Sequence, residues 1–310
     1  MQNILVNVPK AENQGHVWVL LLLLVVFVGL GLFVFGVFLA TGYLLISLGF
    51  DFDLLTKTLS NPTAYPEART SYLIVQGLSS VGAFIVASAL FIKLNLRHTL
   101  KAFFPGVSFK SLGLTVVITF SFMVVNTLFI EWNQGWEFPA FLAGFEDWAI
   151  MQEEKLAGLT EYLTTFDSFG QFLVAFVVVA ALPGIGEELL FRGLIQNLFH
   201  KVLPSPHLAI WLTAFLFAAF HMQFFGLVPR MFLGALFGYL YFYSGNLSLA
   251  MIGHFLNNGI SLTMLYAYNQ GAIETNPADT DAVPSWPVLL LFLVVFVLSF
   301  ITFRKQWSDG

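Results

Sequence analysis

Residues 17–48 read VWVLLLLLVVFVGLGLFVFGVFLATGYLLISL and include no charged side chain. An α-helix crosses a bilayer core of about 30 Å with about 20 apolar residues. This run is therefore long enough for a tilted transmembrane helix, or for a span with an extra turn at the interface. It is too long for the apolar core of a cleavable signal peptide, and Lys10 is the only Lys or Arg before it.

Apolar segments of similar length recur along the 310-residue chain. Further candidates for membrane helices lie at 71–94, 111–131, 169–200, 207–225, 227–244, 247–268 and 286–303. Apolar residues make up 58% of the chain and charged residues 10%, against about 45–50% and about 25% in soluble domains. We therefore expect an all-α fold, a polytopic bundle of about eight transmembrane helices in a lipid bilayer. The composition excludes a soluble enzyme, a disordered protein and a nucleic-acid binder, and the absence of Cys excludes disulfides and thiolate metal sites.

The positions of Lys and Arg predict how the helices are oriented, because cytoplasmic loops are enriched in both. With a cytoplasmic N-terminus, eight basic residues face the cytoplasm: Lys10, Lys93, Arg97, Lys101, Lys110, Lys201, Arg304 and Lys305. The same segments hold two acids, Glu12 and Asp309. The other side then holds four basic residues, Lys57, Arg69, Lys155 and Arg230, and fourteen acids, Asp279 and Asp281 among them. This bias predicts that both termini are cytoplasmic.

The longest polar stretch, 132–168, mixes aromatic residues with acids. It contains Trp132, Trp136, Phe138, Phe141, Phe145 and Trp148 together with Glu146, Asp147, Glu153 and Glu154. This mixture is typical of an amphipathic helix that lies in the membrane interface, here on the outer side. A lid or an element that guides the substrate is the alternative interpretation.

Glu187, Glu188 and Arg192 are the charged residues that this topology places inside the membrane. Ionisable groups at this depth are costly and are functional candidates. On a helix, Glu188 and Arg192 are i,i+4 neighbours that can form an ion pair, whereas Glu187 is rotated by about 100° from Glu188. A clamp between helices would explain the pair but would leave Glu187 without a partner. We therefore expect Glu187 to face a cavity.

Pro183, Gly184 and Gly186 precede the two glutamates. Proline removes a backbone donor and disfavours a straight helix. Irregular backbone at membrane depth is tolerated where it lines a cavity. The pattern predicts a broken helix that leads directly into a water-accessible pair of carboxylates.

Polar side chains on two further segments are expected at a similar depth. With a rise of about 1.5 Å per residue, Glu187 and His221 each lie on the order of 20 Å from the cytoplasmic ends of their segments. On the same scale Asn258 lies at about 18 Å and His254 at about 12 Å. A single histidine in a membrane helix usually forms an interhelical hydrogen bond, but similar depths on three segments favour a shared site.

At these residues the chain resembles the CPBP family, which includes CAAX prenyl proteases, bacteriocin-processing enzymes and bacteriocin-immunity relatives. The matching motifs are Glu187-Glu188-xxx-Arg192, Phe217-xxx-His221 and His254-xxx-Asn258, in the family's order and on three separate segments. The motifs lie within 170–270. The expected organisation is therefore N-terminal helices and an interfacial segment at 1–168, a catalytic core at 169–270, and a C-terminal helix and tail at 271–310.

The resemblance implies an intramembrane endopeptidase that depends on glutamate and is often labelled a metalloprotease. Peptide hydrolysis needs an activated water, a base and groups that stabilise the oxyanion. We assign Glu187 as the base, with His221 sharing the water and passing a proton to the leaving amine. His254 and Asn258 would hydrogen-bond the developing oxyanion, and Arg192 would orient the pair of glutamates.

The residues leave two chemistries open. One Glu and two His, here Glu187, His221 and His254, match the protein ligands of a catalytic zinc site that keeps one position for water. Against zinc, the chain contains no His-Glu-xx-His run, and Arg192 already supplies a positive charge beside the carboxylates. The preferred interpretation is direct catalysis by glutamate without a required cofactor, and zinc is the alternative.

Other classes of function also fit the sequence. A non-catalytic immunity or scaffold protein is one alternative, and a proton-coupled transporter is another because buried Glu, His and Arg also build proton relays. As an enzyme, the protein would act on a peptide or a membrane protein, with or without a lipid group, or on a leader peptide. The many prokaryotic relatives in the family imply a multi-pass protein of the bacterial plasma membrane.

Overall fold

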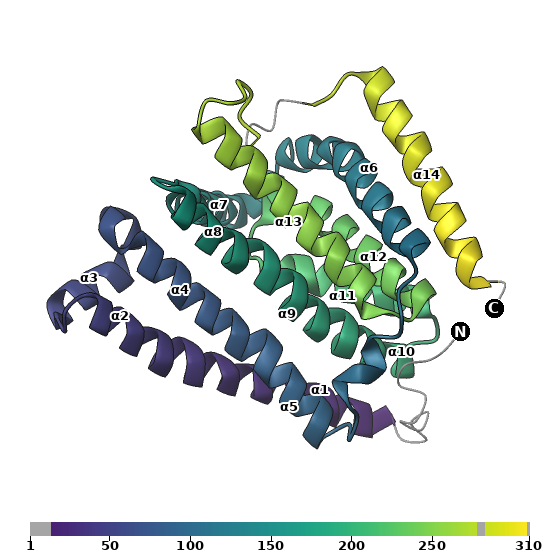
Figure 1. The fold of residues 1–310 in the computed structure, drawn as a ribbon, viewed down its shortest axis with the longest axis horizontal. Coiled ribbons are helices and arrows are strands. Elements are labelled where there is room, and N and C mark those ends of the chain that lie inside the picture. Colours follow the sequence, from purple (N-terminus) through teal and green to yellow (C-terminus); the bar gives the residue numbers. More distant parts are fainter. Residues whose placement is uncertain (1–13, 278–282, 309–310) are drawn as a thin grey trace.

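The computed structural model describes residues 14–277 and 283–308. Within these ranges the chain forms helices and turns and no strand (Figure 1). The expected all-α fold is therefore confirmed. Five residues counted for the orientation, Lys10, Glu12, Asp279, Asp281 and Asp309, lie outside the described residues.

In chain order the α-helical elements of the described residues are α1 (Gln14–Gly31), α2 (Thr41–Ser47), α3 (Phe52–Ser60), α4 (Arg69–Ser80), α5 (Ala87–Leu94), α6 (Phe109–Gln134), α7 (Ala143–Thr164), α8 (Phe169–Ala175), α9 (Leu182–Leu190), α10 (Asn197–Val202), α11 (Pro206–Phe220), α12 (Leu227–Ser244), α13 (Leu247–Asn269) and α14 (Trp286–Ser308). Several of these elements join into longer helices. The π-helical segments η1 (Leu32–Ala40), η4 (Val81–Val86), η7 (Phe176–Ala181) and η8 (Phe191–Gln196) join α1 to α2, α4 to α5, and α8 through α9 to α10. A short 3-10 turn, η9 (Phe224–Gly226), leads into α12.

Six helices in the described part of the chain are long and apolar enough to cross a membrane. They are Gly15–Ser47, Pro66–Leu94, Phe109–Gln134, Phe169–Val202, Phe224–Ser244 and Trp286–Trp307. The remaining two predicted segments are also helical, but α11 has only 15 residues, and polar side chains lower the mean hydropathy of the 23-residue α13. The protein is a multi-pass membrane protein, and the number of eight spans stays a prediction.

α9 and α13 lie side by side in the middle of the bundle (Figure 1). On one side of them, the helix formed by α1, η1 and α2 packs against the helix formed by α4, η4 and α5, and η4 contacts α9. On the other side, α6 packs against α13 and contacts α14 at the edge of the bundle. α12 contacts α13, and α11 contacts both α12 and η8. The helices that carry the three motifs are therefore neighbours.

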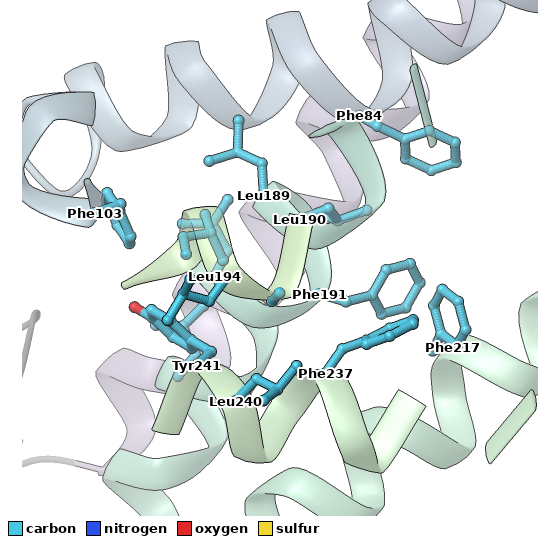
Figure 2. Packing of buried hydrophobic residues seen from close by; sticks show 14 of the residues in the cluster. Phe84, Phe103, Leu189, Leu190, Phe191, Leu194, Phe217, Phe237, Leu240 and Tyr241 are labelled. Carbon is cyan, nitrogen blue, oxygen red and sulfur yellow. The ribbon is translucent and has the colours of Figure 1, made fainter. Parts of the chain in front are cut away.

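Large apolar side chains fill the space between these helices. Leu189, Leu194, Phe217 and Phe237 are buried members of one cluster, and Figure 2 shows the ring of Phe191 beside that of Phe217. Their centroids lie 5.3 Å apart in an edge-to-face arrangement. Inside a bilayer such packing stabilises through van der Waals contact rather than through removal from water. It fixes the spacing of the helices that carry the polar motif residues.

Two glycines let α9 approach its neighbours closely. A Cβ on Gly184 would lie 3.1 Å from the backbone nitrogen of Phe255 in α13, and one on Gly186 would lie 2.8 Å from Cβ of Phe84 in η4. Larger side chains at these positions would push the helices apart, because small residues are what allow close packing in membranes. The glycines thus hold the turn that carries the glutamates against α13 on one side and η4 on the other.

The helix around Pro183 is continuous, and the predicted break is wrong. α9 follows η7 without interruption, and Pro183 lies in the first turn of α9. Proline has no N–H for the carbonyl four residues earlier, which belongs to Val179. Nδ2 of Asn258 donates to that carbonyl over 3.1 Å. A side chain from α13 thereby donates to a carbonyl in the turn before Pro183, where proline supplies no backbone N–H.

The predicted interfacial segment contains α7, which packs over the loop between α11 and α12. The ring centroids of Trp136, Phe138 and Phe145 lie 5.9, 5.1 and 5.3 Å from that of Phe224 in η9. This aromatic cluster fixes the loop that follows His221. The helix is confirmed, and its location at the membrane interface stays a prediction.

Candidate active site

A cavity of about 630 Å³ lies between α4, α9, α11, α12 and α13. Its charged, imidazole and amide side chains on the last four helices and the loop after α11 are Glu187, His221, Arg230, His254, Asn257 and Asn258. Hydroxyl and amide side chains of α4 line the cavity as well, and much of the remaining lining is apolar. The four residues expected at similar depths, Glu187, His221, His254 and Asn258, therefore share one cavity.

Glu188 is the centre of a fully buried polar network. Its Oε1 accepts hydrogen bonds from Nη1 of Arg192 over 2.7 Å and from Nδ1 of His254 over 2.8 Å. The ion pair with Arg192, predicted from the spacing, is present, and both side chains have no exposed area. Neither residue is part of the cavity lining. Glu188 and Arg192 thus act on the cavity only through the residues they hold.

Arg192 is held from three directions. Besides Glu188, it donates from Nη2 to the carbonyl of Gly234 in α12 over 2.7 Å. Its Cζ lies 4.6 Å from the centroid of the Phe217 ring, in a cation–π contact. A Cβ on Gly234 would lie 3.1 Å from Nη2. The guanidinium therefore ties α12 and α11 to the glutamate pair, and glycine is what leaves room for it.

Glu187 has the free carboxylate of the pair. It lines the cavity, and its Oε2 is buried without a hydrogen-bond partner. The described residues form no ion pair with it. A buried carboxylate oxygen without a donor is rare in proteins because the desolvation of the charge is not compensated. A water molecule in the cavity would supply the missing donor.

His254 is oriented by Glu188 and by two aromatic rings. Phe237 stacks on the imidazole with centroids 5.3 Å apart, and Phe217 meets it edge to face at 5.8 Å. Because Nδ1 donates to Glu188, the neutral ring presents Nε2 as an acceptor. Donation from Nε2 to an oxyanion, the role expected for His254, therefore requires the doubly protonated ring.

His221 lies at the C-terminal end of α11. The predicted segment 207–225 ends as a helix at Phe220, and Met222 follows with a left-handed φ of 54°. The ending leaves the carbonyl of Phe217 without its usual backbone donor, and Nδ1 of His221 lies 2.9 Å from it. With the proton on Nδ1, Nε2 carries a lone pair that can accept a proton from water.

The side chain of Asn258 forms hydrogen bonds within the protein. Its Nδ2 donates to the carbonyl of Val179, and its Oδ1 accepts from Nδ2 of Asn257 over 3.1 Å. One N–H of the Nδ2 amide remains for a further acceptor. The expected oxyanion contact is compatible with that N–H, but the contact to Val179 could not be foreseen from the spacing.

The fit to a metal is incomplete. In both His221 and His254 the Nδ1 atom meets a carbonyl or carboxylate oxygen, which is how metal-binding histidines are usually oriented. Within residues 14–277 and 283–308, however, no three His, Cys, Asp or Glu side chains are grouped closely enough to hold an ion. The proposed set of Glu187, His221 and His254 therefore does not fit a metal as it stands.

Arg230 was not predicted to belong to the site. The sequence places it among the basic residues of the outer side, yet it lies in the first turn of α12 and lines the cavity. Its neighbour Gln223, which no spacing singled out, accepts from Nη2 of Arg230 over 2.7 Å. The one available signal was its position inside the apolar segment 227–244 rather than before it.

Comparison with known proteins agrees with this geometry. The site combines a buried glutamate pair, two histidines and an asparagine on neighbouring helices. Residues 169–260 match the family model described as Type II CAAX prenyl endopeptidase Rce1-like, and this stretch contains all three motifs. The resemblance of this part of the chain to CAAX-type proteases is thereby confirmed. No curated protein and no solved structure matches the chain.

Proposed function

We propose that the protein hydrolyses peptide bonds within the membrane by means of a water molecule activated by Glu187 and His221, without a required cofactor. The observation that carries this proposal is the division of the glutamate pair. Oε1 of Glu188 is engaged by Arg192 and His254, and Glu188 lies outside the cavity lining, whereas Glu187 lines the cavity and has an unpartnered Oε2. A carboxylate that faces a cavity without a donor is suited to take a proton from water.

In the proposed reaction, water attacks the carbonyl carbon of the scissile bond while Glu187 accepts one of its protons. The new C–O bond forms as the carbonyl electrons move onto oxygen, and the oxyanion accepts hydrogen bonds from Asn258 and protonated His254. Collapse of the intermediate breaks the C–N bond. The leaving nitrogen takes the proton from Glu187, with Nε2 of His221 as the relay.

Glu188 and Arg192 would act as positioning residues. Their ion pair and the bond from Glu188 to His254 fix the imidazole before the substrate arrives. Such preorganisation accelerates a reaction because no reorientation is needed when charge develops. Arg192 also keeps a positive charge close to the intermediate without occupying the cavity.

The family match and the cavity wall support a proposal for the substrate class. Phe84, Phe217, Phe220 and Leu233 line the cavity, so an extended peptide with apolar side chains or a lipid group is compatible with it. We propose a peptide or membrane-protein substrate of the CAAX type, with its prenylated cysteine before the cleaved bond. We further propose that the protein lies in a bacterial plasma membrane with both termini in the cytoplasm.

The test is cleavage of a farnesylated CAAX peptide by the purified full chain in detergent. Replacing Glu187 by Gln keeps the volume and removes the base, so turnover should fall by roughly 10²–10⁴. Glu154→Gln is the matched control, because this exposed residue of α7 undergoes the same chemical change away from the cavity. Near-normal turnover of Glu187→Gln would contradict the proposal. No turnover by the unchanged protein on CAAX and leader peptides would favour the scaffold or transporter alternative.

A further inference from the structure

Arg230 places a guanidinium in the wall of the cavity, which Arg192 does not line. Its Nη2 donates to Gln223, and its Nη1 is buried without any hydrogen-bond acceptor. The described residues form no ion pair with it. The mechanism proposed above has no use for this charge.

The guanidinium is held in place by its surroundings. Oε1 of Gln223 accepts a hydrogen bond from Nη2 of Arg230, and Nε2 of Gln223 donates to Oε1 of Glu153 in α7 over 2.9 Å. A Cβ on Gly226 would overlap with Nη1 and would lie 2.8 Å from Cζ of Arg230. Glycine is therefore needed at this position for the guanidinium to occupy its place. An arginine that is positioned before a ligand arrives loses little freedom on binding.

The backbone that carries Arg230 is fixed as well. The backbone N–H of Val228 donates to Oδ1 of Asn133 over 2.9 Å, and Nδ2 of Asn126 lies 3.4 Å from the carbonyl of Pro229. Both asparagines belong to α6. Two side chains of another helix thus hold the first turn of α12, and with it the root of the Arg230 side chain.

A purely structural arginine would be expected to pair directly with the nearby carboxylate. Here the neutral amide of Gln223 lies between Arg230 and Glu153, so the guanidinium keeps a free donor on the side of Nη1. Guanidinium groups recognise carboxylates with short, charge-assisted hydrogen bonds. A peptide brings such a group either as its C-terminal carboxylate or as an Asp or Glu side chain.

We propose that Arg230 binds a carboxylate of the peptide substrate on the side of the cavity next to His221. This inference rests on the proposed peptidase function and adds a specificity-determining residue to it. Arg230 lines the same cavity as Glu187 and His221, so a bound carboxylate fixes the peptide relative to the activated water. For a CAAX-type substrate the carboxylate at the free C-terminus of the departing tripeptide is the closest source.

The experiment compares three farnesylated peptides that differ only at the C-terminal end: the free acid, its C-terminal amide, and the amide with Glu as the last residue. Hydrogen bonds to charged groups predict that the unchanged protein has a KM about 10- to 100-fold lower for the free acid than for the amide. The kcat values should differ little. A low KM for the third peptide would identify a side-chain carboxylate as sufficient, and a high one would restrict recognition to the C-terminus.

Variants at Arg230 test whether this residue causes the preference for the free acid. Arg230→Gln should raise the KM for the free acid to that of the amide, and Arg230→Lys should restore part of the preference. Lys155→Gln is the matched control, since it removes one positive charge from an exposed position of α7 and should keep the preference. A variant Arg230→Gln that retains the preference, or that lowers kcat equally for all three peptides, would show a structural role and overturn the inference.

A binding measurement tests carboxylate recognition by Arg230 independently of peptide cleavage. Glu187→Gln protein is titrated with fluorescent versions of the free acid and the amide, without any need for turnover. A preference for the acid that disappears when Arg230→Gln is added supports carboxylate recognition even if no cleavage is ever seen. Equal affinity for both peptides overturns the inference even if the enzyme cleaves them.

Discussion

Nδ1 of His254 lies 2.8 Å from Oε1 of Glu188, although the two residues are 66 positions apart in the sequence. The same oxygen accepts from Arg192 one turn away on its own helix. One carboxylate thus joins a cation of its own helix to the imidazole of another. The adjacent Glu187 is left out of this network, and on that separation rest the different roles that we propose for the two glutamates.

The first prediction separates these roles by stability. Glu188→Gln leaves Arg192 buried without a charged partner, and breaking a buried ion pair costs about 3–5 kcal/mol. The side chain of Glu187 forms no hydrogen bond or ion pair with the described residues, so Glu187→Gln should melt close to the unchanged protein. Thermal unfolding in detergent measures both, and turnover per folded molecule is recorded beside it. A folded, fully stable but inactive Glu188→Gln together with an active Glu187→Gln would reverse the assignment.

The second prediction concerns Asn258 and Pro183. Asn258→Ala removes the side-chain donor from the half-buried carbonyl of Val179, and the loss of such a hydrogen bond costs about 0.5–1.5 kcal/mol. Pro183→Ala returns a backbone N–H to that carbonyl, so Asn258→Ala should cost less in the Pro183→Ala background. A double-mutant cycle on melting free energies measures the coupling, expected at about 0.5–3 kcal/mol. Additive effects would show that the two residues do not share this carbonyl.

The same double variant separates structure from catalysis. If Asn258 also donates to the oxyanion, the Pro183→Ala, Asn258→Ala protein should stay slow by about 10²–10³, the loss seen when one oxyanion donor is removed, although its stability is restored. If turnover returns together with stability, the asparagine acts only by holding the helix.

Local periodicity was sufficient to predict the helix that carries the two glutamates but not its surroundings. The spacing of Glu188 and Arg192 predicts an ion pair because both lie on one helix. The predicted break at Pro183 was wrong. Asn258, whose side chain donates to the carbonyl of Val179 in the turn before the proline, lies 79 positions after Val179 in the sequence. Arg230 was missed for the same reason: Gln223 is held by Glu153, 70 positions away. In both cases the deciding contacts join residues that are far apart in the sequence, and the spacing of residues within one segment cannot predict such contacts.

The third prediction tests the close packing at the glutamate turn. Gly186→Ala brings a Cβ to 2.8 Å from Cβ of Phe84, and overpacking of this kind typically costs about 1–3 kcal/mol. Gly113→Ala in α6 is the matched control, because a Cβ there meets nothing within 4 Å. It should leave the melting temperature unchanged or raise it, since alanine favours helix by about 0.5–1 kcal/mol. Equal behaviour of the two variants would refute tight contact between α9 and η4.

The fourth prediction concerns orientation, which rests on the charge distribution. A reporter fused after residue 105 should be active in the cytoplasm, and one fused after residue 150 should be active outside. The last turn of α5 carries Lys93, and the segment between α5 and α6 carries Arg97 and Lys101. Cytoplasmic ends and loops are enriched in such residues. The reverse pattern at both fusion points would mean that the cavity lies closer to the cytoplasmic surface than proposed.

The last prediction concerns the metal. In direct catalysis, the unpartnered oxygen of Glu187 activates water, and Glu188 rather than an ion fixes His254. Turnover of the farnesylated peptide should then be unchanged after dialysis against a chelator, and purified protein should contain far less than one zinc ion per chain. A zinc enzyme behaves differently, because its bound metal both generates the nucleophile and polarises the carbonyl. One zinc per chain, lost together with activity on chelation and also lost in His221→Ala, would show that the cavity rearranges around an ion and that Glu187 acts as its ligand.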